Sequence, residues 1–414
     1  MDTKTFEAER KHDFTRKLRQ AGVFEAVVDY IAWQKKVRQA KANGQEAPVM
    51  PGGRGPISIN LDLTTACNYS CTHCIDWDIL NSPIKYNHDN LKMSLQNMIN
   101  LGLRSVILIG GGEATIYPGF GDIVRFLKER NVQVAIVSNG SRNQVIYDIA
   151  GKLTSGDWVR LSLDAGINDT FVRMHNPAKA ISLEAICEWV PRIHILNPVL
   201  PVAFSFIITW EGSNRAGEAE VIPNIEEMIT ATKLARDYQF NYISFKPFLT
   251  RRPSGTEVMD TTLMHNFDKT IVRIREAITE AKTYETEKFK VIESTNLRVL
   301  LRGNWQDFTR QPKTCHMQAF RQVLSPLGLF NCPAYRGAQA GYIGNARSWG
   351  NSGQNGQTQK LIADIIDRFD ASHECKEITC LYNPVNLWLE RAVTGEINES
   401  EFEAIVQDQE DFFL

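Results

Sequence analysis

The segment "ISINLDLTTACNYSCTHCIDW", residues 57–77, places an apolar run directly before three closely spaced cysteines. Its first seven residues are rich in branched apolar side chains and predict a buried β-strand. Cys67, Cys71 and Cys74 follow within eight positions, and no fourth cysteine lies nearby. Three thiols at this spacing indicate a metal or iron–sulfur site at the end of the strand.

Short β-rich runs alternate with amphipathic helical segments from this strand onward. Five more such runs follow, at residues 105–110, 132–138, 158–164, 201–209 and 241–247. Helical patterns separate them, for example at residues 91–102 and 120–130. This alternation predicts a parallel sheet with helices outside it. Because six units are too few for an eight-stranded barrel, we expect an α/β fold built on a partial (β/α)6 TIM-like barrel.

The composition changes at both ends of this repeating pattern. Residues 1–50 are charged with helically spaced apolar positions, so we expect an N-terminal helical extension, followed by a linker rich in Pro and Gly. The partial barrel is expected over residues 55–255 and a helical linker over residues 256–305. Residues 306–414 carry four more cysteines and little alternation, and they predict a small C-terminal iron–sulfur domain.

Composition and charge exclude several classes of protein. Hydrophobic residues form 43% of the 414 residues, and 46 basic residues against 48 acidic ones give a formal net charge of -2, so no nucleic-acid partner is expected. No apolar run is long enough to span a membrane. The charged N-terminus lacks the apolar core of a secretion signal, so we expect a cytoplasmic protein. Eight cysteines in so long a chain do not indicate a disulfide framework.

The cysteine triplet has two interpretations on its residues alone. Three thiolates can hold three irons of a [4Fe–4S] cluster, whose full protein ligation would be four, and the missing ligand leaves one iron open for catalysis. The alternative is a zinc site made of the three cysteines and His73. His73 is adjacent to Cys74, which is an awkward spacing for two ligands of one tetrahedral ion.

The CxxxCxxC pattern at the end of the first strand resembles the radical S-adenosylmethionine (radical SAM) superfamily, over residues 57 to about 250. Weaker motifs follow in the expected order at successive strand ends: "GGGE" (110–113), "SNG" (138–140) and "LSLDAG" (161–166). The resemblance implies a [4Fe–4S] cluster on Cys67, Cys71 and Cys74 that binds S-adenosylmethionine (SAM) at its open iron. It also implies SAM contacts from His73 near adenine, from Gly111, Gly112 and Glu113 at the amino group, from Ser138 and Asn139, from Ser162 and Asp164, and from Arg173 at the carboxylate.

Each of these weaker motifs has an ordinary explanation when taken singly. Glycines after a strand usually form a turn, and Asp164 is a common type of helix cap. Their joint order at consecutive strand ends favours a SAM site. That order also argues against a protein that only carries clusters for electron transfer, which needs no such site.

The remaining cluster of cysteines lies in the C-terminal part. Cys315 and Cys332 flank a predicted β-hairpin around "SPLG", and Cys375 and Cys380 follow later. Four cysteines are a complete set for one closed [4Fe–4S] cluster. Residues 310–385 resemble the twitch domain, the shortened relative of the SPASM domain, which implies an auxiliary cluster. The last gap of four residues departs from the usual C-x2-C ending, and structural zinc or a substrate ligand in place of one cysteine stays open.

The resemblance implies a reductive cleavage of SAM to a 5′-deoxyadenosyl radical, which abstracts hydrogen from a substrate carbon. We expect an oxidative modification of a ribosomally made peptide. The alternatives are dehydrogenation or epimerisation of a small polar natural product, such as an aminosugar or polyol, and peptide epimerisation. The expected partners are the substrate, a one-electron reductant such as flavodoxin or ferredoxin, and a separate peptide-recognition protein. Cys187 lies on an amphipathic helix and is expected to pack in the core, the alternative being a hydrogen-atom donor.

Overall fold

The computed structural model of the chain describes residues 12–215, 219–350, 352–398, 401–407 and 409–414. Its main feature is a ten-stranded sheet with the order β11-β8-β5-β4-β3-β2-β1-β12-β13-β14. The pairs from β11 through to β12 are parallel, and β13 and β14 add antiparallel strands at one edge. The strands are β1 (Ser58–Leu61), β2 (Ser105–Leu108), β3 (Gln133–Ser138), β4 (Trp158–Ser162), β5 (Val202–Ile208), β8 (Tyr242–Pro247), β11 (Lys290–Glu293), β12 (Arg321–Ser325), β13 (Gly328–Phe330) and β14 (Tyr342–Gly344).

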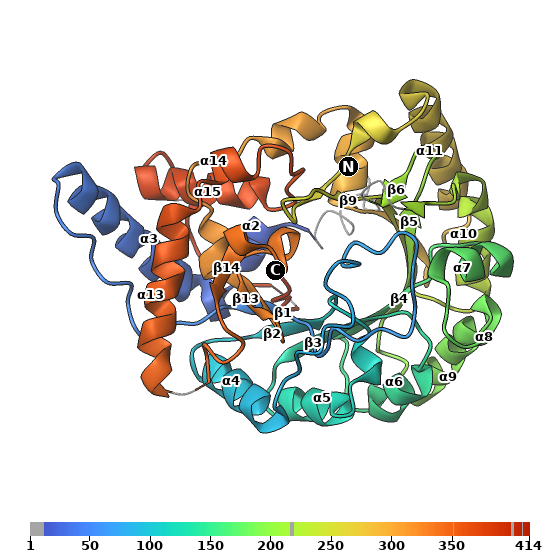
Figure 1. Cartoon of the computed structure of the whole chain (residues 1–414), viewed down its shortest axis with the longest axis horizontal. Helices are drawn as coiled ribbons and strands as arrows, with labels where there is room; N and C mark the ends of the chain where they lie inside the picture. The colour runs from blue at the N-terminus through green and yellow to red at the C-terminus, as the bar shows by residue number, and fades with distance from the viewer. Residues whose placement is uncertain (1–11, 216–218, 351, 399–400, 408) are drawn as a thin grey trace.

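Helices cover the outer face of the curved sheet, as Figure 1 shows. They are α4 (His88–Asn100), α5 (Phe120–Lys128), α6 (Asn143–Ala150), α7 (Asn168–His175), α8 (Leu183–Cys187), α9 (Trp189–Leu196), α10 (Met228–Asp237), α11 (Phe267–Lys282) and α12 (Thr295–Arg302). Strand β4 displays the two faces of the sheet. Val159 and Leu161 are fully buried in the core, whereas the alternating Trp158, Arg160 and Ser162 are only partly buried.

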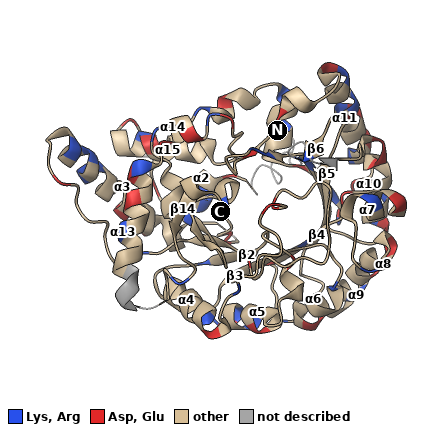
Figure 2. Ribbon diagram, viewed as in Figure 1, with Lys and Arg blue, Asp and Glu red and all other residues tan. Residues whose placement is uncertain are grey.

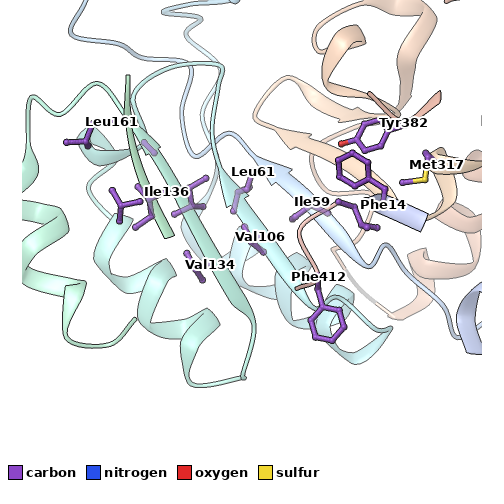
Figure 3. Packing of buried hydrophobic residues seen from close by; sticks show 14 of the residues in the cluster. Phe14, Ile59, Leu61, Val106, Val134, Ile136, Leu161, Met317, Tyr382 and Phe412 are labelled. Carbon is purple, nitrogen blue, oxygen red and sulfur yellow. The ribbon is translucent and has the colours of Figure 1, made fainter. Parts of the chain in front are cut away.

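The core between sheet and helices is continuous along the strands. Figure 3 shows Leu61, Val106, Ile136 and Leu161, from four successive parallel strands, with other members of this buried cluster. The same cluster extends through Ile59 toward the N- and C-terminal helices. The expected α/β partial barrel is therefore confirmed, and all six predicted strands are present.

Two parallel strands lie outside the predicted barrel limits. β11 falls within residues 256–305, which were predicted to be a helical linker, and it pairs with β8. β12 falls within residues 306–414, and it pairs with every residue of β1. The linker is therefore not purely helical, because a four-residue run pairs there with the exposed edge of β8. The domain limits themselves stay a prediction, and the sheet continues across two of them.

The N-terminal helices pack against the C-terminal part of the chain. They are α2 (Phe14–Leu18) and α3 (Ala21–Ala42), and Figure 1 shows α3 beside α13 (Ser352–Arg368). Arg38 of α3 forms a bidentate ion pair with Glu390 of α15 (Asn383–Thr394), with distances of 2.9 and 2.6 Å. The predicted helical extension is thus confirmed from residue 14, and its first eleven residues lie outside the described residues.

Residues 412–414 cover the amino ends of several barrel strands. The Phe412 carbonyl accepts a hydrogen bond from Ser105 Oγ at 2.7 Å. The Phe413 ring packs edge-on against Trp158, with 5.5 Å between ring centroids. Only 6% of the Phe412 and Phe413 surfaces is exposed, so this segment closes the interior at that end.

Acidic and basic residues are interspersed over the outer helices, as Figure 2 shows. This mixed surface agrees with the near-neutral formal charge of the chain. Among the described residues, no helix combines the length and the apolar character needed to cross a bilayer.

Candidate functional site

The three cysteines lie in a long loop that leaves the carboxyl end of β1. Asn81 holds the start of this loop, because its side chain accepts a hydrogen bond from Cys67 N at 3.1 Å and its own N–H donates to Thr65 O at 2.7 Å. Farther along, Thr72 N donates to Met174 O at 2.8 Å and docks the loop against α7. The loop therefore lies at the carboxyl ends of the strands, where the active sites of parallel barrels are found.

The three thiols lie close enough to one another to interact electrostatically. Burial, followed by the neighbouring Cys74 and Cys67, raises the pKa of the Cys71 thiol well above its usual value. Burial, followed by Asp76, raises the pKa of Cys74 to about 12. Thiolates in this position need added positive charge, which bound iron supplies. Three partly buried thiols on one loop fit three ligands of a [4Fe–4S] cluster.

The glycine-rich turn after β2 packs directly against the cysteine loop. The N–H of Glu113 donates to Ala66 O at 2.9 Å. A side-chain carbon on Gly112 would lie 2.3 Å from that same Ala66 oxygen, so only glycine permits this approach. The predicted association of "GGGE" with the cysteine segment is thus present as a backbone contact.

We expect Gly112→Ala to displace the cysteine loop, because the added methyl group cannot fit against backbone atoms. Overpacking of this kind costs roughly 1–3 kcal/mol. Thermal unfolding and iron content after anaerobic reconstitution measure the effect, and both should fall. Gly151→Ala is the matched control, since nothing lies within 4 Å of its added carbon. Full iron content and unchanged stability in Gly112→Ala would show that the loop tolerates the methyl group.

Glu113 connects the ends of β2 and β3. Its Oε1 accepts hydrogen bonds from Thr115 N at 3.0 Å and Ser138 Oγ at 2.8 Å, and its Oε2 accepts one from Asn139 N at 2.8 Å. The Asn139 side chain in turn donates to Asn68 Oδ1 at 3.0 Å, in the cysteine loop. A carboxylate oxygen can accept two hydrogen bonds, and among the described residues Oε2 accepts only one. Glu113 is therefore buried, oriented and able to accept a further donor.

A second buried cluster lies beside the cysteines. His73 Nε2 donates to Asp164 Oδ2 at 3.0 Å, and the rings of His73 and His175 meet edge to face at 4.9 Å. His175 Nε2 donates to Leu163 O at 3.0 Å, and its Nδ1 lies 3.3 Å from Cys71 Sγ. Burial raises the pKa of Asp164, but the His73 hydrogen bond and charge outweigh it, so that this pKa is lowered overall. Within the described residues, the buried Nδ1 of His73 has no hydrogen-bond partner.

The structure brings most predicted cofactor residues together, with one exception. Ser162 ends β4 on the interior face, next to the backbone that leads to Asp164. Arg173 instead lies on the outer face of α7, with 61% of its side-chain surface exposed and Asp169 3.6 Å away. The cofactor contacts assigned to these residues stay predictions. Arg173 is the one whose side chain lies outside the buried cluster.

An arginine from the C-terminal part of the chain also contacts the site, and no sequence motif predicted it. Arg336 Nη1 contacts Asp76 Oδ2 at 2.8 Å, and its Nε contacts Asp62 Oδ2 at 3.2 Å. Asp76 follows Cys74 by two residues and also accepts from Gly111 N at 3.1 Å. Burial raises the pKa of Asp62 to about 7. Arg336 thus ties β1, the cysteine loop and the glycine turn together.

The four C-terminal cysteines come from separate segments that converge. The predicted hairpin between Cys315 and Cys332 is formed by β12 and β13. Cys380 N donates to Phe308 O, and residues near Cys375 pair with residues near Cys315. Burial, followed by Cys315, Cys380 and Cys332, raises the pKa of the Cys375 thiol well above its usual value. All four thiols therefore lie within electrostatic reach of one another and fit a second cluster.

Cys187 lies at the end of α8 and is fully buried among core residues. Its helix belongs to the outer layer, on the far side of the sheet from the barrel interior. Burial raises the pKa of the Cys187 thiol. The prediction of core packing is confirmed.

Two residues of the site, His175 and Arg336, were not predicted from the sequence, because their partners are distant in sequence. The one feature of the sequence that could have pointed to Arg336 is its position four residues after Cys332.

Residues 61–216, which include the cysteine loop and the ends of β2 to β4, match the model of the radical SAM superfamily. A S-adenosylmethionine-dependent nucleotide dehydratase from Fibrobacter sp. (strain UWH6) is 24% identical over 162 residues, which is 37% of this chain and 47% of that protein. Mycofactocin maturase MftC from Mycolicibacterium smegmatis is 30% identical over 119 residues, 28% of this chain and 30% of that protein. The chain thus matches less than half the length of either relative.

Two solved structures share the fold. Streptococcus suis SuiB superposes with a TM-score of 0.53 at 13% identity, over 79% of this chain and 71% of SuiB. The anSMEcpe protein with bound AdoMet gives a TM-score of 0.52 at 12% identity, over 84% of this chain and 98% of that protein. The family match, the partial barrel and the buried hydrogen-bonded group at its strand ends agree, and residues 61–216 of the chain form a radical SAM domain.

Proposed function

We propose that this chain holds a [4Fe–4S] cluster on Cys67, Cys71 and Cys74 and cleaves SAM in order to abstract hydrogen from a substrate carbon. One observation carries this proposal. The cysteine loop packs against the buried Glu113 and its hydrogen-bond partners at the carboxyl ends of β1, β2 and β3. When bound, the cluster supplies one electron to the sulfonium of SAM, which gives methionine and a 5′-deoxyadenosyl radical.

Two buried polar atoms support SAM as the cofactor. Glu113 Oε2 retains an acceptor site, which suits the ammonium group of a bound amino acid. His73 donates through Nε2 to Asp164, so in its neutral form Nδ1 is an acceptor. No described residue donates to this Nδ1, which therefore suits the amino group of adenine. Gly111, Gly112, Ser138, Asn139, Ser162 and Asp164 complete the proposed surroundings of SAM, and Arg173 is retained for the carboxylate only if its exposed side chain turns inward.

Glu113→Gln tests the SAM site, because it keeps the shape of the side chain and removes its charge. We expect SAM to bind about tenfold or more weakly, since a charged acceptor for the ammonium group is lost. Equilibrium binding to anaerobically reconstituted protein measures the affinity, with iron content as the check on folding. Glu184→Gln, in the first turn of α8 and only partly buried, is the control. Unchanged affinity in Glu113→Gln would remove this residue from the SAM site.

We further propose that Cys315, Cys332, Cys375 and Cys380 hold an auxiliary [4Fe–4S] cluster. The mutual approach of the four thiols supports a single shared centre. When bound, such a cluster can accept the electron that remains on a substrate after hydrogen abstraction. Oxidation is therefore the favoured net reaction, because Cys187, the alternative hydrogen donor, is buried in the outer layer.

A ribosomally made peptide is the proposed substrate. SuiB, which shares the fold, has been solved with its precursor peptide SuiA, and this supports the proposal by analogy. The nucleotide dehydratase relative supports the second candidate, a small polar molecule. A flavodoxin or ferredoxin is the proposed reductant, and a separate peptide-recognition protein is a proposed partner. The cytoplasm is the proposed compartment, because eight free cysteines suit reducing conditions.

Cys375→Ala and Cys187→Ala separate oxidation from epimerisation. With substrate, Cys375→Ala should still form 5′-deoxyadenosine but little product, because the auxiliary electron acceptor is lost. Cys187→Ala should form product at nearly the normal rate. Chromatography of 5′-deoxyadenosine and mass spectrometry of the product measure both. The assignment reverses if Cys375→Ala makes full product while Cys187→Ala makes none and the wild-type product carries deuterium from solvent.

A further inference from the structure

Two basic side chains point from the sheet into the barrel interior. Arg160 of β4 alternates with the core residues Val159 and Leu161, and Lys246 of β8 alternates with the core residue Phe245. Because side chains of a strand alternate between its faces, both cations face away from the helices. The same face also carries small side chains, at Ala203 and Ser205 of β5 and at Ser244 of β8.

Neither cation has an acidic partner among the residues that the structure describes. Lys246 Nζ donates to Ser205 Oγ at 3.0 Å. The Arg160 guanidinium lies 4.9 Å from the Trp158 ring centroid, and its buried Nε has no hydrogen-bond partner in the described part of the chain. Among the described residues, no carboxylate lies within ion-pair distance of either side chain. Both side chains are partly buried. Withdrawing an unpaired charge from water is costly, so proteins rarely keep one there without a use.

Other basic residues near the barrel mouth are neutralised, which makes these two distinctive. Arg251 contacts Asp76 at 3.5 Å and Asp78 at 3.3 Å. Arg252 contacts Asp260 at 2.9 Å and Glu377 at 3.3 Å. Among the described residues, Lys246 differs from these two arginines because no carboxylate lies within ion-pair distance of it.

The potential around the two cations is positive. Burial, followed by Arg160, lowers the pKa of Lys246 well below its usual value, although Asp164 opposes this. Burial, followed by Lys17, Arg298, Arg160 and Lys246, lowers the pKa of His12 to about 3. Asp164 is the nearest acidic influence, and its carboxylate is already held by His73. An anion at this position would meet net positive charge from the described residues.

We propose that Arg160, Lys246 and Ser205 form a subsite for an oxyanion of the substrate, either a carboxylate or a phosphate. A guanidinium, an ammonium and a hydroxyl supply the donors that such groups accept. Phe413 and Trp158 close the interior below Arg160, and the His73–Asp164 cluster lies toward the strand ends. Calling the ligand a substrate rests on the proposed function. It narrows the substrate to one with an acidic group, such as an acidic peptide residue or a phosphorylated small molecule.

Thermal unfolding of the reconstituted protein tests the subsite without using activity. Inorganic phosphate and succinate are compared with chloride at matched ionic strength. We expect one or both to raise the wild-type midpoint, because a ligand that binds only the folded state stabilises it. Phosphate alone would assign a phosphorylated substrate, and succinate alone a carboxylate. No rise with either anion overturns the proposal.

Variants locate the effect. Arg160→Met and Lys246→Met should each lower the affinity of the protein for the anion by about tenfold or more. In chloride, Arg160→Met should unfold at the wild-type midpoint or above it, because an unpaired and partly buried charge is removed. Arg160→Lys keeps a cation and should retain part of the response. Arg192→Met is the matched control, since Arg192 lies 5.0 Å from the Trp189 ring with its guanidinium exposed. A lower midpoint in Arg160→Met with an undiminished anion response means a structural role and contradicts the subsite.

SAM binding and cleavage separate this proposal from the proposed function. Arg160→Met should bind SAM and form 5′-deoxyadenosine in the absence of substrate as the wild type does. A tenfold loss of SAM affinity with an unchanged anion response would assign the cations to the cofactor and overturn the subsite. Anion binding that persists in a wild-type protein unable to cleave SAM would leave the subsite standing and refute the proposed function.

Discussion

Replacing Cys67, Cys71 and Cys74 together by alanine is expected to remove about four of roughly eight irons from the anaerobically reconstituted protein. The reason is that each set of cysteines holds its own cluster. The three thiols of the loop converge at the end of β1, whereas the other four converge beside the β12–β13 hairpin. Iron and acid-labile sulfide analysis measures the loss, and the same variant should form no 5′-deoxyadenosine.

The matched control for this result is Cys187→Ala, which removes a thiol from the core and should keep all the iron. The complementary variant, with Cys315, Cys332, Cys375 and Cys380 replaced, should also lose about four irons but should keep slow SAM cleavage. Zinc in place of iron in the wild-type protein, or equal iron in the wild type and the triple variant, would contradict the assignment.

Arg336→Met is expected to lower the free energy of unfolding by about 3–5 kcal/mol, because it removes the guanidinium that contacts the buried Asp62 and leaves Asp76 with Arg251 as its cation. Asp62 is completely buried and Asp76 is 5% exposed, so water cannot replace the lost partner. The loss should also loosen the cysteine loop, since Asp76 is hydrogen-bonded to the glycine turn. Urea unfolding measures the free energy, and SAM affinity reports on the loop.

Arg310→Met is the control for this variant, because its ion pair with Asp307 is on the surface and should contribute less than about 1 kcal/mol. Adding Asp62→Asn to Arg336→Met should recover part of the loss, since one unpaired charge is then removed. A loss in Arg336→Met as small as that of the control, or no recovery in the double variant, would show that the network is not a stabilising link.

The sequence was sufficient for features that depend on local pattern. Apolar runs alternating with amphipathic segments located the six strands, and "SPLG" located the β12–β13 turn. The order of motifs at strand ends predicted that Glu113, Ser138 and Asn139 lie close together, because parallel strands present their carboxyl ends at one edge. In the structure these three residues form one hydrogen-bonded group.

Features that depend on distant pairing were not predictable. β11 is a four-residue run whose only distinction is that it meets the free edge of β8. Arg336 acquires its role from Asp62 and Asp76, more than two hundred residues away in the chain. Arg160 looks like any polar position of a strand until the opposite face is seen to be the core. The family resemblance placed Arg173 at the SAM carboxylate, but its side chain is exposed on the outer face of α7.

The most direct test of the central claim is whether the reduced protein cleaves SAM. The reconstituted wild type, given a strong one-electron reductant and SAM without substrate, should slowly form 5′-deoxyadenosine and methionine in equal amounts. The variant without Cys67, Cys71 and Cys74 should form neither. Absence of 5′-deoxyadenosine from a wild-type protein that holds its full iron would contradict the account and favour a protein that only carries electrons.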